Sequence, residues 1–451
     1  DGSDTGWRIN WQYGKYTDPN NNSYKVWMDE GMHLPRHDGQ AAYFLPAIQN
    51  FINGPTGLVY NPGTCLGPEW AGHFFMSEFR GGPSNSHLHT FTMQPNGAGF
   101  KLGYAKEILG GLLPTGLDFG PDGALYFGDW INGWGAKGKG KIWRLDGGDA
   151  GAMEAERQGV ATLLQRDFSE ISTGELKDLL AHADQRIRRK AQFMLANSGK
   201  TGARIFLEVA SGNGPELARI HAIWGLAQQV RYGVTDGQVL LPLLTALEPE
   251  IIAQTAKMIG DQRIPGGEAQ LIDLLQHRNP RVQFFATEAL GRLRHGPAIN
   301  PIIALLREND DKDVYLRQAG MIALGRIGNA DALGKLSNDP SSAVRIAAVV
   351  ALRRMRAAQT ANFLSDRDPY IVAEAARAIH DDFSIEAAMP KLAELLSREG
   401  ITNEVVLRRA ISANFRLGTD KEAGELFDYA RRQDAPPAMG AEALAALATG
   451  G

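Results

Sequence analysis

Cysteine is almost absent from this chain of 451 residues, in which Cys65 is the only one. A single thiol excludes intramolecular disulfides, zinc sites built from cysteines and C-x-x-C-H haem attachment within the chain. A catalytic thiol would need a neighbouring base, and the sequence around Cys65 offers none. We therefore expect Cys65 to be a structural residue.

The chain also lacks an excess of one charge and long apolar runs. Its formal net charge is only −4 at pH 7, so we expect no nucleic-acid surface. No run approaches the roughly 20 apolar residues of a membrane span, so we expect no transmembrane segment. No signal peptide or initiator methionine is visible, and the chain opens at Asp1. We therefore expect a fragment or a processed form.

Aromatic residues are unevenly distributed along the chain. Seven of the eight tryptophans precede residue 147, in a part rich in glycine, proline and asparagine, whereas the rest is rich in alanine, leucine and arginine. This shift indicates a domain boundary near Gly147–Arg157. We predict a β + α multidomain chain, with a β domain over 1–146, a linker over 147–165 and a helical domain over 166–451.

The second part contains a repeat of two helices. Apolar residues recur at i, i+3, i+4 and i+7, and each second helix carries one small residue at a fixed place. These residues recur at spacings of 27 to 35 positions: Ala191, Ala222, Ala256, Ala286, Gly320, Ala348, Ala375 and Ala410. This period predicts an α-solenoid of HEAT-like repeats, with Asp or Asn before the second helix as N-cap.

The first part reads as short strands with an internal echo. GPTGLVYNPG at Gly54–Gly63 returns as LPTGLDFGPDG at Leu113–Gly123, and an aromatic strand follows each copy. A four-stranded repeat of this length is the period of a propeller blade. We predict a partial β-propeller of two to three blades, whose remaining blades lie outside this chain or come from a partner.

Four motifs of the first part carry a resemblance: GSDTGWR (Gly2–Arg8), GPTGLVYNPGT (Gly54–Thr64), GHFFMSEFRGGPSNS (Gly72–Ser86) and the stretch Asp118–Leu145. They resemble a bacterial family described as membrane-bound dehydrogenases. Its members join a propeller like that of soluble quinoprotein sugar dehydrogenases to HEAT repeats, often followed by a c-type haem module. The order of the two parts is similar here over nearly the whole length.

The resemblance implies the cofactor PQQ with a calcium ion at the mouth of the propeller channel. It implies a histidine base that would lie in an earlier blade, outside this chain, and Arg80 as a cation for the PQQ carboxylates. The sequence departs from the family just before the DFGPDG turn. Leu113–Gly116 stand where the relatives place a pair of arginines.

Other polar residues are candidates with two readings each. Asp4 and Arg8 suit a loop that faces a ligand, or an Asx-turn with a surface ion pair. His37, in HLPRHD with His33, could face a ligand or bind metal, but Pro35 argues against the helix that would bring the two histidines together. Arg80 could bind an anion, or pair with Glu78 or Asp129.

Two further patterns concern metals. His87 and His89 point to one face of a strand, a spacing that can chelate zinc or copper, but no third ligand is apparent and an exposed strand face is the alternative. Asp118 and Asp129 occupy the first and last places of an EF-hand-like loop. Gly120 at place three lacks an oxygen, so we expect a GPDG hairpin turn instead. Blade geometry requires neither aspartate, which makes both candidates for ligand binding.

Two functions follow. One is an oxidoreductase subunit acting on sugars or alcohols, periplasmic by resemblance, with a protein partner on the solenoid and an electron-transfer cytochrome. The other is a non-catalytic interaction scaffold with a degenerate propeller, which the missing arginine pair favours.

Overall fold

The computed structural model describes residues 24, 26–131, 133–135, 137–148, 153–381 and 384–449. Its contacts divide the chain into two compact units, Asp1–Gln49 with Glu268–Gly451, and Asn50–Gly267. Each unit is described separately. The predicted domain boundaries stay a prediction.

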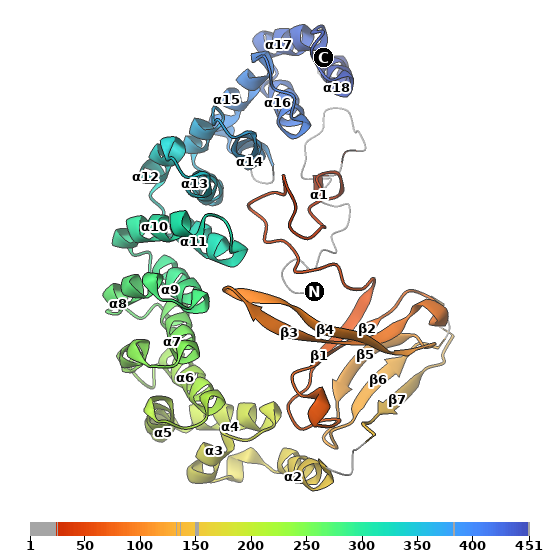
Figure 1. Cartoon of the computed structure of the whole chain (residues 1–451), viewed down its shortest axis with the longest axis vertical. Helices are drawn as coiled ribbons and strands as arrows, with labels where there is room; N and C mark the ends of the chain where they lie inside the picture. The colour runs from red at the N-terminus through yellow and green to blue at the C-terminus, as the bar shows by residue number, and fades with distance from the viewer. Residues whose placement is uncertain are drawn as a thin grey trace. The chain divides into compact units, whose positions relative to one another are not determined.

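The unit Asn50–Gly267 contains two antiparallel sheets (Figure 1). The first has the order β1-β2-β3-β4, with β1 (Pro55–Tyr60), β2 (Phe74–Glu78), β3 (His87–Asn96) and β4 (Gly99–Gly110). The second has the order β5-β6-β7, with β5 (Pro114–Phe119), β6 (Leu125–Asp129) and β7 (Lys141–Leu145). Within the described residues these strands close no barrel or propeller ring. Short 3-10 turns lie at η2 (Pro68–Trp70) and η3 (Pro83–Asn85).

The GPDG stretch is a hairpin turn, as predicted. Phe119 pairs with Leu125 across β5 and β6, and the Gly120 amide donates to the Ala124 carbonyl at 2.9 Å. Gly123 adopts φ +77°, which favours glycine. The two echoed motifs are equivalent in the fold, because each opens one of the two sheets.

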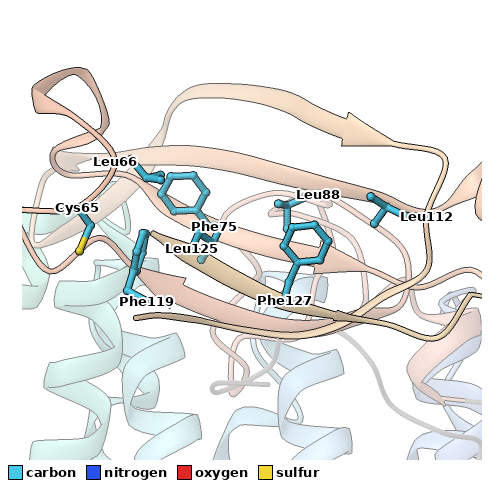
Figure 2. Close-up of a cluster of buried hydrophobic side chains, with 8 residues drawn as sticks. All are labelled: Cys65, Leu66, Phe75, Leu88, Leu112, Phe119, Leu125 and Phe127. Carbon is cyan, nitrogen blue, oxygen red and sulfur yellow. The ribbon is translucent and has the colours of Figure 1, made fainter. Parts of the chain in front are cut away.

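An apolar core lies between the sheets (Figure 2). Successive side chains of a strand point to opposite faces, so every second one enters this core. Leu88 points inward from β3, while its neighbours His87 and His89 lie on the opposite face. The core comprises Cys65, Leu66, Phe75, Leu88, Leu112, Phe119, Leu125 and Phe127. Burial raises the pKa of the Cys65 thiol to about 11, so the thiol stays protonated at neutral pH, in agreement with a structural role.

Helices follow the sheets in the same unit: α2 (Glu154–Gln165), η5 (Phe168–Glu170), α3 (Thr173–Leu179), α4 (Gln185–Asn197), α5 (Gly199–Ser211), α6 (Glu216–Arg231), η6 (Gly237–Thr245) and α7 (Pro249–Gln262). Arg186 ties α4 to the β5–β6 turn, because its guanidinium donates to the Gly120 carbonyl at 2.8 Å. Thr64 adds a bond of 2.6 Å to the Asp184 carboxylate. The expected linker contains α2, whose Arg157 pairs with Asp146 at 2.9 Å.

The described part of the other unit is mainly helical. It contains α1 (Val26–Asp29), α8 (Glu268–Asp273), α9 (Pro280–Arg292), α10 (Ile299–Asn309), α11 (Val314–Ile327), α12 (Ala330–Gly334), α13 (Ser342–Met355), α14 (Pro369–His380), α15 (Met389–Ala393), α16 (Glu404–Leu417), α17 (Asp420–Ala430) and α18 (Pro437–Thr449). Short 3-10 helices complete it: η7 (Leu274–Gln276), η8 (Gly296–Ala298), η9 (Lys335–Asn338), η10 (Ala358–Phe363), η11 (Glu386–Ala388) and η12 (Glu394–Ser397). None of the helices in the described part of the chain could span a membrane.

The predicted repeat is confirmed by the packing of its small residues, which are all buried. At Gly320 even a methyl group would lie 2.7 Å from a Leu306 methyl, so the close approach of α10 and α11 favours glycine there. The predicted caps are also present. Asp184, Asn279 and Asp368 accept bonds from the first turns of α4, α9 and α14.

Candidate functional site

The earliest residues that the structure describes pack against the helical repeats of their own unit. Residues 24 and 26–44, here called the N-terminal segment, run beside α14 and α16 (Figure 1). The segment has a small apolar cluster of its own, made of Val26, Met32, Ala41 and Phe44. It contains one short helix, α1, and is otherwise irregular, so its position depends on what its side chains bind.

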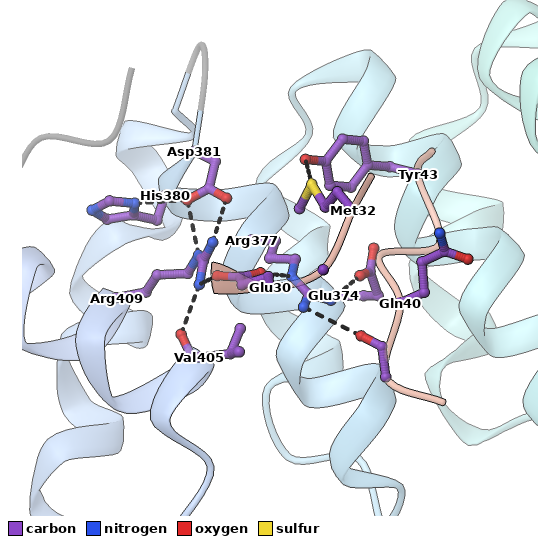
Figure 3. Close-up of polar contacts among 12 residues, drawn as sticks. Glu30, Met32, Gln40, Tyr43, Glu374, Arg377, His380, Asp381, Val405 and Arg409 are labelled. Atoms are coloured by element: carbon purple, nitrogen blue, oxygen red, sulfur yellow. Dashed lines mark hydrogen bonds and ion pairs between the residues drawn. The ribbon is translucent and has the colours of Figure 1, made fainter. Parts of the chain in front are cut away.

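Glu30 is the central anchor of the N-terminal segment (Figure 3). One carboxylate oxygen accepts a bond of 2.7 Å from Arg377 of α14. The other lies 2.8 Å from the Arg409 guanidinium of α16 and accepts a bond of 2.6 Å from the Tyr24 hydroxyl. The Glu30 side chain is only 2% exposed. One carboxylate from the segment thus joins two consecutive repeats.

Each arginine also has an acid of its own in the repeats. Arg409 makes a bidentate pair with Asp381, at 2.8 and 2.7 Å, and Arg377 pairs with Glu374. Burial alone would raise the pKa of Glu30, but Arg409 and Arg377 outweigh it and hold that pKa below its ordinary value. The carboxylate therefore stays ionised at neutral pH.

Aromatic and backbone contacts continue along the segment. The Arg353 guanidinium of α13 stacks on the Tyr43 ring, 3.7 Å from its centroid, and Arg408 of α16 lies 4.3 Å from the Tyr24 ring. Tyr370 of α14 donates to the Gln40 carbonyl at 2.7 Å. The segment therefore runs from α16 back to α13, against the order of the repeats.

Two hollows of about 350 Å³ each adjoin the segment. One is lined by Tyr43, Arg353, Arg354 and Asp381, among others. The other is lined by residues that include His37, Glu30 and Arg377. Both combine charged groups with the edge of the segment, so they could admit a polar group of a binding partner.

The predicted ligand residues of the sheets lie apart. Arg80 is exposed and pairs with neither Glu78 nor Asp129, and its backbone amide donates to Ser86 at 2.9 Å. Asp118 is opposite Tyr126 near the turn, whereas Asp129 is opposite Pro114 at the other end of the hairpin.

Asp129 has a structural role. Its carboxylate accepts bonds from the Leu113 and Ile131 amides at 3.0 and 2.8 Å, and from the Trp143 indole at 2.9 Å. Burial would raise its pKa, but these bonds outweigh burial and lower it. Asp118 uses one oxygen to accept a bond from the Phe119 amide at 2.8 Å.

His37 is held within the N-terminal segment. Its ring nitrogens lie 3.1 Å from the Gly31 carbonyl and 2.9 Å from the Asp38 carbonyl. Asp4 and Arg8 lie outside the described residues. The ligand-binding roles of all six residues (Arg80, Asp118, Asp129, Asp4, Arg8 and His37) stay predictions.

The sequence did not identify Glu30, Arg377 and Arg409. A signal was present, because Arg377 interrupts the small-residue run AEAARAIH and Arg409 lies in VVLRRAISA. A charged residue within an apolar helix face is buried only with a partner. The partner is more than 340 positions away, so no local pattern could identify it.

Comparison with known proteins supports the repeats alone. The family model of HEAT repeats matches residues 237–315 and 299–367. A crystal structure of an engineered protein is 19% identical, covering 66% of this chain and 95% of its own, with a TM-score of 0.32. Human deoxyhypusine hydroxylase in complex with glycerol is 16% identical, covering 57% of this chain and 97% of its own, with a TM-score of 0.23. No curated protein matches. The chain thus contains HEAT repeats, and none of these matches supports a dehydrogenase family.

Proposed function

We propose that the chain is a non-catalytic interaction scaffold, whose HEAT-repeat face over α13, α14 and α16 holds an extended, glutamate-bearing segment of polypeptide. The burial of Glu30 between Arg377 and Arg409 carries this proposal. HEAT repeats offer long surfaces to partner chains. Here such a surface is occupied by the chain's own segment.

The contacts have the character of peptide recognition. A buried carboxylate between two guanidinium groups gives a specific anchor, because either arginine would lose a charged partner without it. Stacking of Arg353 on Tyr43 adds a second, aromatic anchor. A protein partner would use the same two features, an acidic side chain and an aromatic ring. We also propose that the chain has a second module, a degenerate and partial propeller, to which its two antiparallel sheets would belong.

A synthetic peptide with the sequence of residues 24–44 tests the proposal. The fluorescence anisotropy of the labelled peptide is measured as the full chain is added. The chain is either unchanged or carries Glu30→Arg. This substitution places a third cation between the two arginines and should displace the segment from the repeats. We expect the peptide to bind Glu30→Arg, and to bind the unchanged chain at least tenfold more weakly, because that chain fills its own surface.

Hydrogen exchange over residues 26–44 verifies that Glu30→Arg releases the segment while the helices stay protected. A peptide with glutamine in place of Glu30 is the matched control, and should bind at least tenfold more weakly, equivalent to about 1.4 kcal/mol. Equal binding of both peptides, or no binding to a chain whose segment is released, would exclude this surface as a receptor.

The oxidoreductase subunit implied by the resemblance is the second candidate. The exposed guanidinium of Arg80 favours it, because it is available for an anion. Asp129, in contrast, already uses both carboxylate oxygens, and Leu113–Gly116 supply no cation, so these residues fit PQQ and calcium poorly. The periplasmic location and the cytochrome partner depend on this candidate. Addition of PQQ with calcium and a sugar tests it, and no thermal shift at saturating PQQ would count against it.

A further inference from the structure

The outward face of the first sheet gathers two histidines and a glutamate. His87 and His89 of β3 point to the same face, and Glu78 at the end of β2 is the cross-strand partner of His87. His87 Nδ1 lies 3.2 Å from Glu78 Oε2, and His89 Nε2 lies 3.0 Å from the same oxygen. The third ligand that the sequence did not reveal is therefore supplied by sheet register.

We propose that Glu78, His87 and His89 bind a divalent transition-metal ion of the zinc class. The three ligand atoms lie within 4.8 Å of one another. A tetrahedral zinc ion with bonds of about 2.0–2.1 Å would hold its ligand atoms about 3.3–3.4 Å apart. The two observed distances, 3.0 and 3.2 Å, need to widen by only a few tenths of an ångström. This site is independent of the scaffold role proposed above.

The surroundings of the three ligands orient them. The Asn53 amide donates to the second carboxylate oxygen of Glu78 at 3.0 Å, which leaves the first oxygen for the two imidazoles. Glu107 lies 3.7 Å from Nε2 of His87, and the Phe51 and His89 rings pack in a T-shaped arrangement with their centroids 5.8 Å apart. Outer partners of this kind fix the tautomer and the ring orientation of metal-bound histidine.

Both nitrogens of His87 have a place in the proposed site. Each faces a carboxylate, Nδ1 towards Glu78 and Nε2 towards Glu107. A metal-bound imidazole carries its one N–H on the nitrogen that does not bind the metal. A metal on Nδ1 of His87 therefore leaves Nε2–H directed towards Glu107, which lies 3.7 Å away.

The donor set selects the class of ion. Two imidazole nitrogens and one carboxylate suit zinc, copper or nickel, whereas calcium and magnesium take oxygen ligands. The two histidine side chains are 22% and 14% exposed. Solvent can therefore reach both imidazoles.

Titration of the chelator-treated full chain with zinc chloride alone, by calorimetry, tests the site. We expect one zinc ion per chain. Glu78→Gln and His89→Gln each remove a ligand, and should weaken binding by more than the 10–100-fold that loss of an outer partner costs. Glu107→Gln should weaken it within that smaller range. His295→Gln is the matched control for non-specific histidine binding, and should leave the affinity unchanged.

X-ray absorption of the unmutated, zinc-loaded chain keeps the proposal falsifiable if the variants do not fold. Two imidazoles among nitrogen and oxygen ligands would support it. Zinc affinity that is the same in His89→Gln as in the unmutated chain would overturn the proposal and leave a hydrogen-bonded cluster only. A metal shell without imidazole would overturn it as well.

Discussion

The Glu30 cluster and the Glu78 cluster use carboxylates in opposite ways. In the helical unit, Glu30 contacts two arginines, whose charge does not depend on pH in the physiological range. In the sheets, Glu78 contacts two histidines, a residue type that commonly binds metal. The first cluster is almost fully buried, whereas the histidines of the second are reached by solvent.

This difference predicts that the Glu30 cluster is needed for stability, whereas the Glu78 cluster can change its bonding partners. Buried arginine–carboxylate pairs are costly to break, because removal of one partner leaves an uncompensated charge. In the sheet cluster Glu78 is also buried, but the two histidines are partly exposed. Replacement of Glu78 should therefore cost less, because water can solvate the histidines that remain. We therefore assign the first cluster to holding a chain segment and the second to binding an ion.

The largest expected effect is that of Arg409→Ala. This change leaves Glu30 and Asp381 buried without their common cation, so the free energy of unfolding should fall by about 3–5 kcal/mol. Urea denaturation followed by circular dichroism measures it.

Arg416→Ala on the same helix is the matched control. Arg416 is 20% exposed, pairs at 2.6 Å with Glu386, which is 72% exposed, and donates to the Ser384 hydroxyl at 3.0 Å. Because water can solvate the carboxylate that remains, its loss should cost only about 1 kcal/mol. Equal losses for both variants would remove the contrast between buried and exposed pairs.

A smaller loss of stability is expected when low pH protonates His221 of α6. The partner of this histidine is the side-chain amide of Gln192, at 2.7 Å, and not a carboxylate. Burial, with a contribution from Arg188, lowers the pKa of His221 from 6.5 to about 4. The unfolded chain therefore binds this proton first. The stability that neutral His221 supplies is complete above pH 6.5 and is lost as pH falls towards 4, on the order of 3 kcal/mol.

Unfolding of the unmutated chain and of His221→Gln at pH 7 and pH 4.5 checks this effect. The variant should lose less stability between the two pH values, because glutamine does not titrate. His295→Gln is the control and should follow the unmutated chain. A pH dependence that is identical in all three proteins would contradict the assignment.

The smallest expected effect is that of Glu78→Gln in the presence of a metal chelator. Glutamine can still accept the Asn53 amide, but it loses the charge that strengthens the bonds from His87 and His89. We expect a loss of about 1–2 kcal/mol, clearly less than for Arg409→Ala. Glu107→Gln, which changes an exposed side chain, should stay within about 0.5 kcal/mol. A loss as large as that of Arg409→Ala would mean that the fold depends on the Glu78 cluster as much as on the Glu30 cluster.

Much of the fold could be predicted because its signals are local. The small residues from Ala191 to Ala410, the aspartate and asparagine caps and the GPDG turn each depend on a few neighbouring positions. The structure has helices, caps and a hairpin at these places. The propeller prediction needed more than local signals, since ring closure depends on strands that the described residues do not supply.

The candidate sites could be predicted only in part. The alternation of His87 and His89 already placed both rings on one face. Glu78 was visible in the sequence, but only the antiparallel register of β2 and β3 places it opposite His87. Glu30 had no signal of its own, because an acidic residue outside a periodic helix or strand pattern is ordinarily solvated.

By itself the sequence determined the helical repeat, the strands and turns of the sheets, and the absence of disulfides. These follow from periodicity, backbone preferences and composition, which act between near neighbours. Only the tertiary structure decided that Glu30 is buried between Arg377 and Arg409, and that Glu78 completes the histidine pair. The physical reason is that a charge is buried, or a metal site formed, only where groups distant in sequence meet at bonding distance.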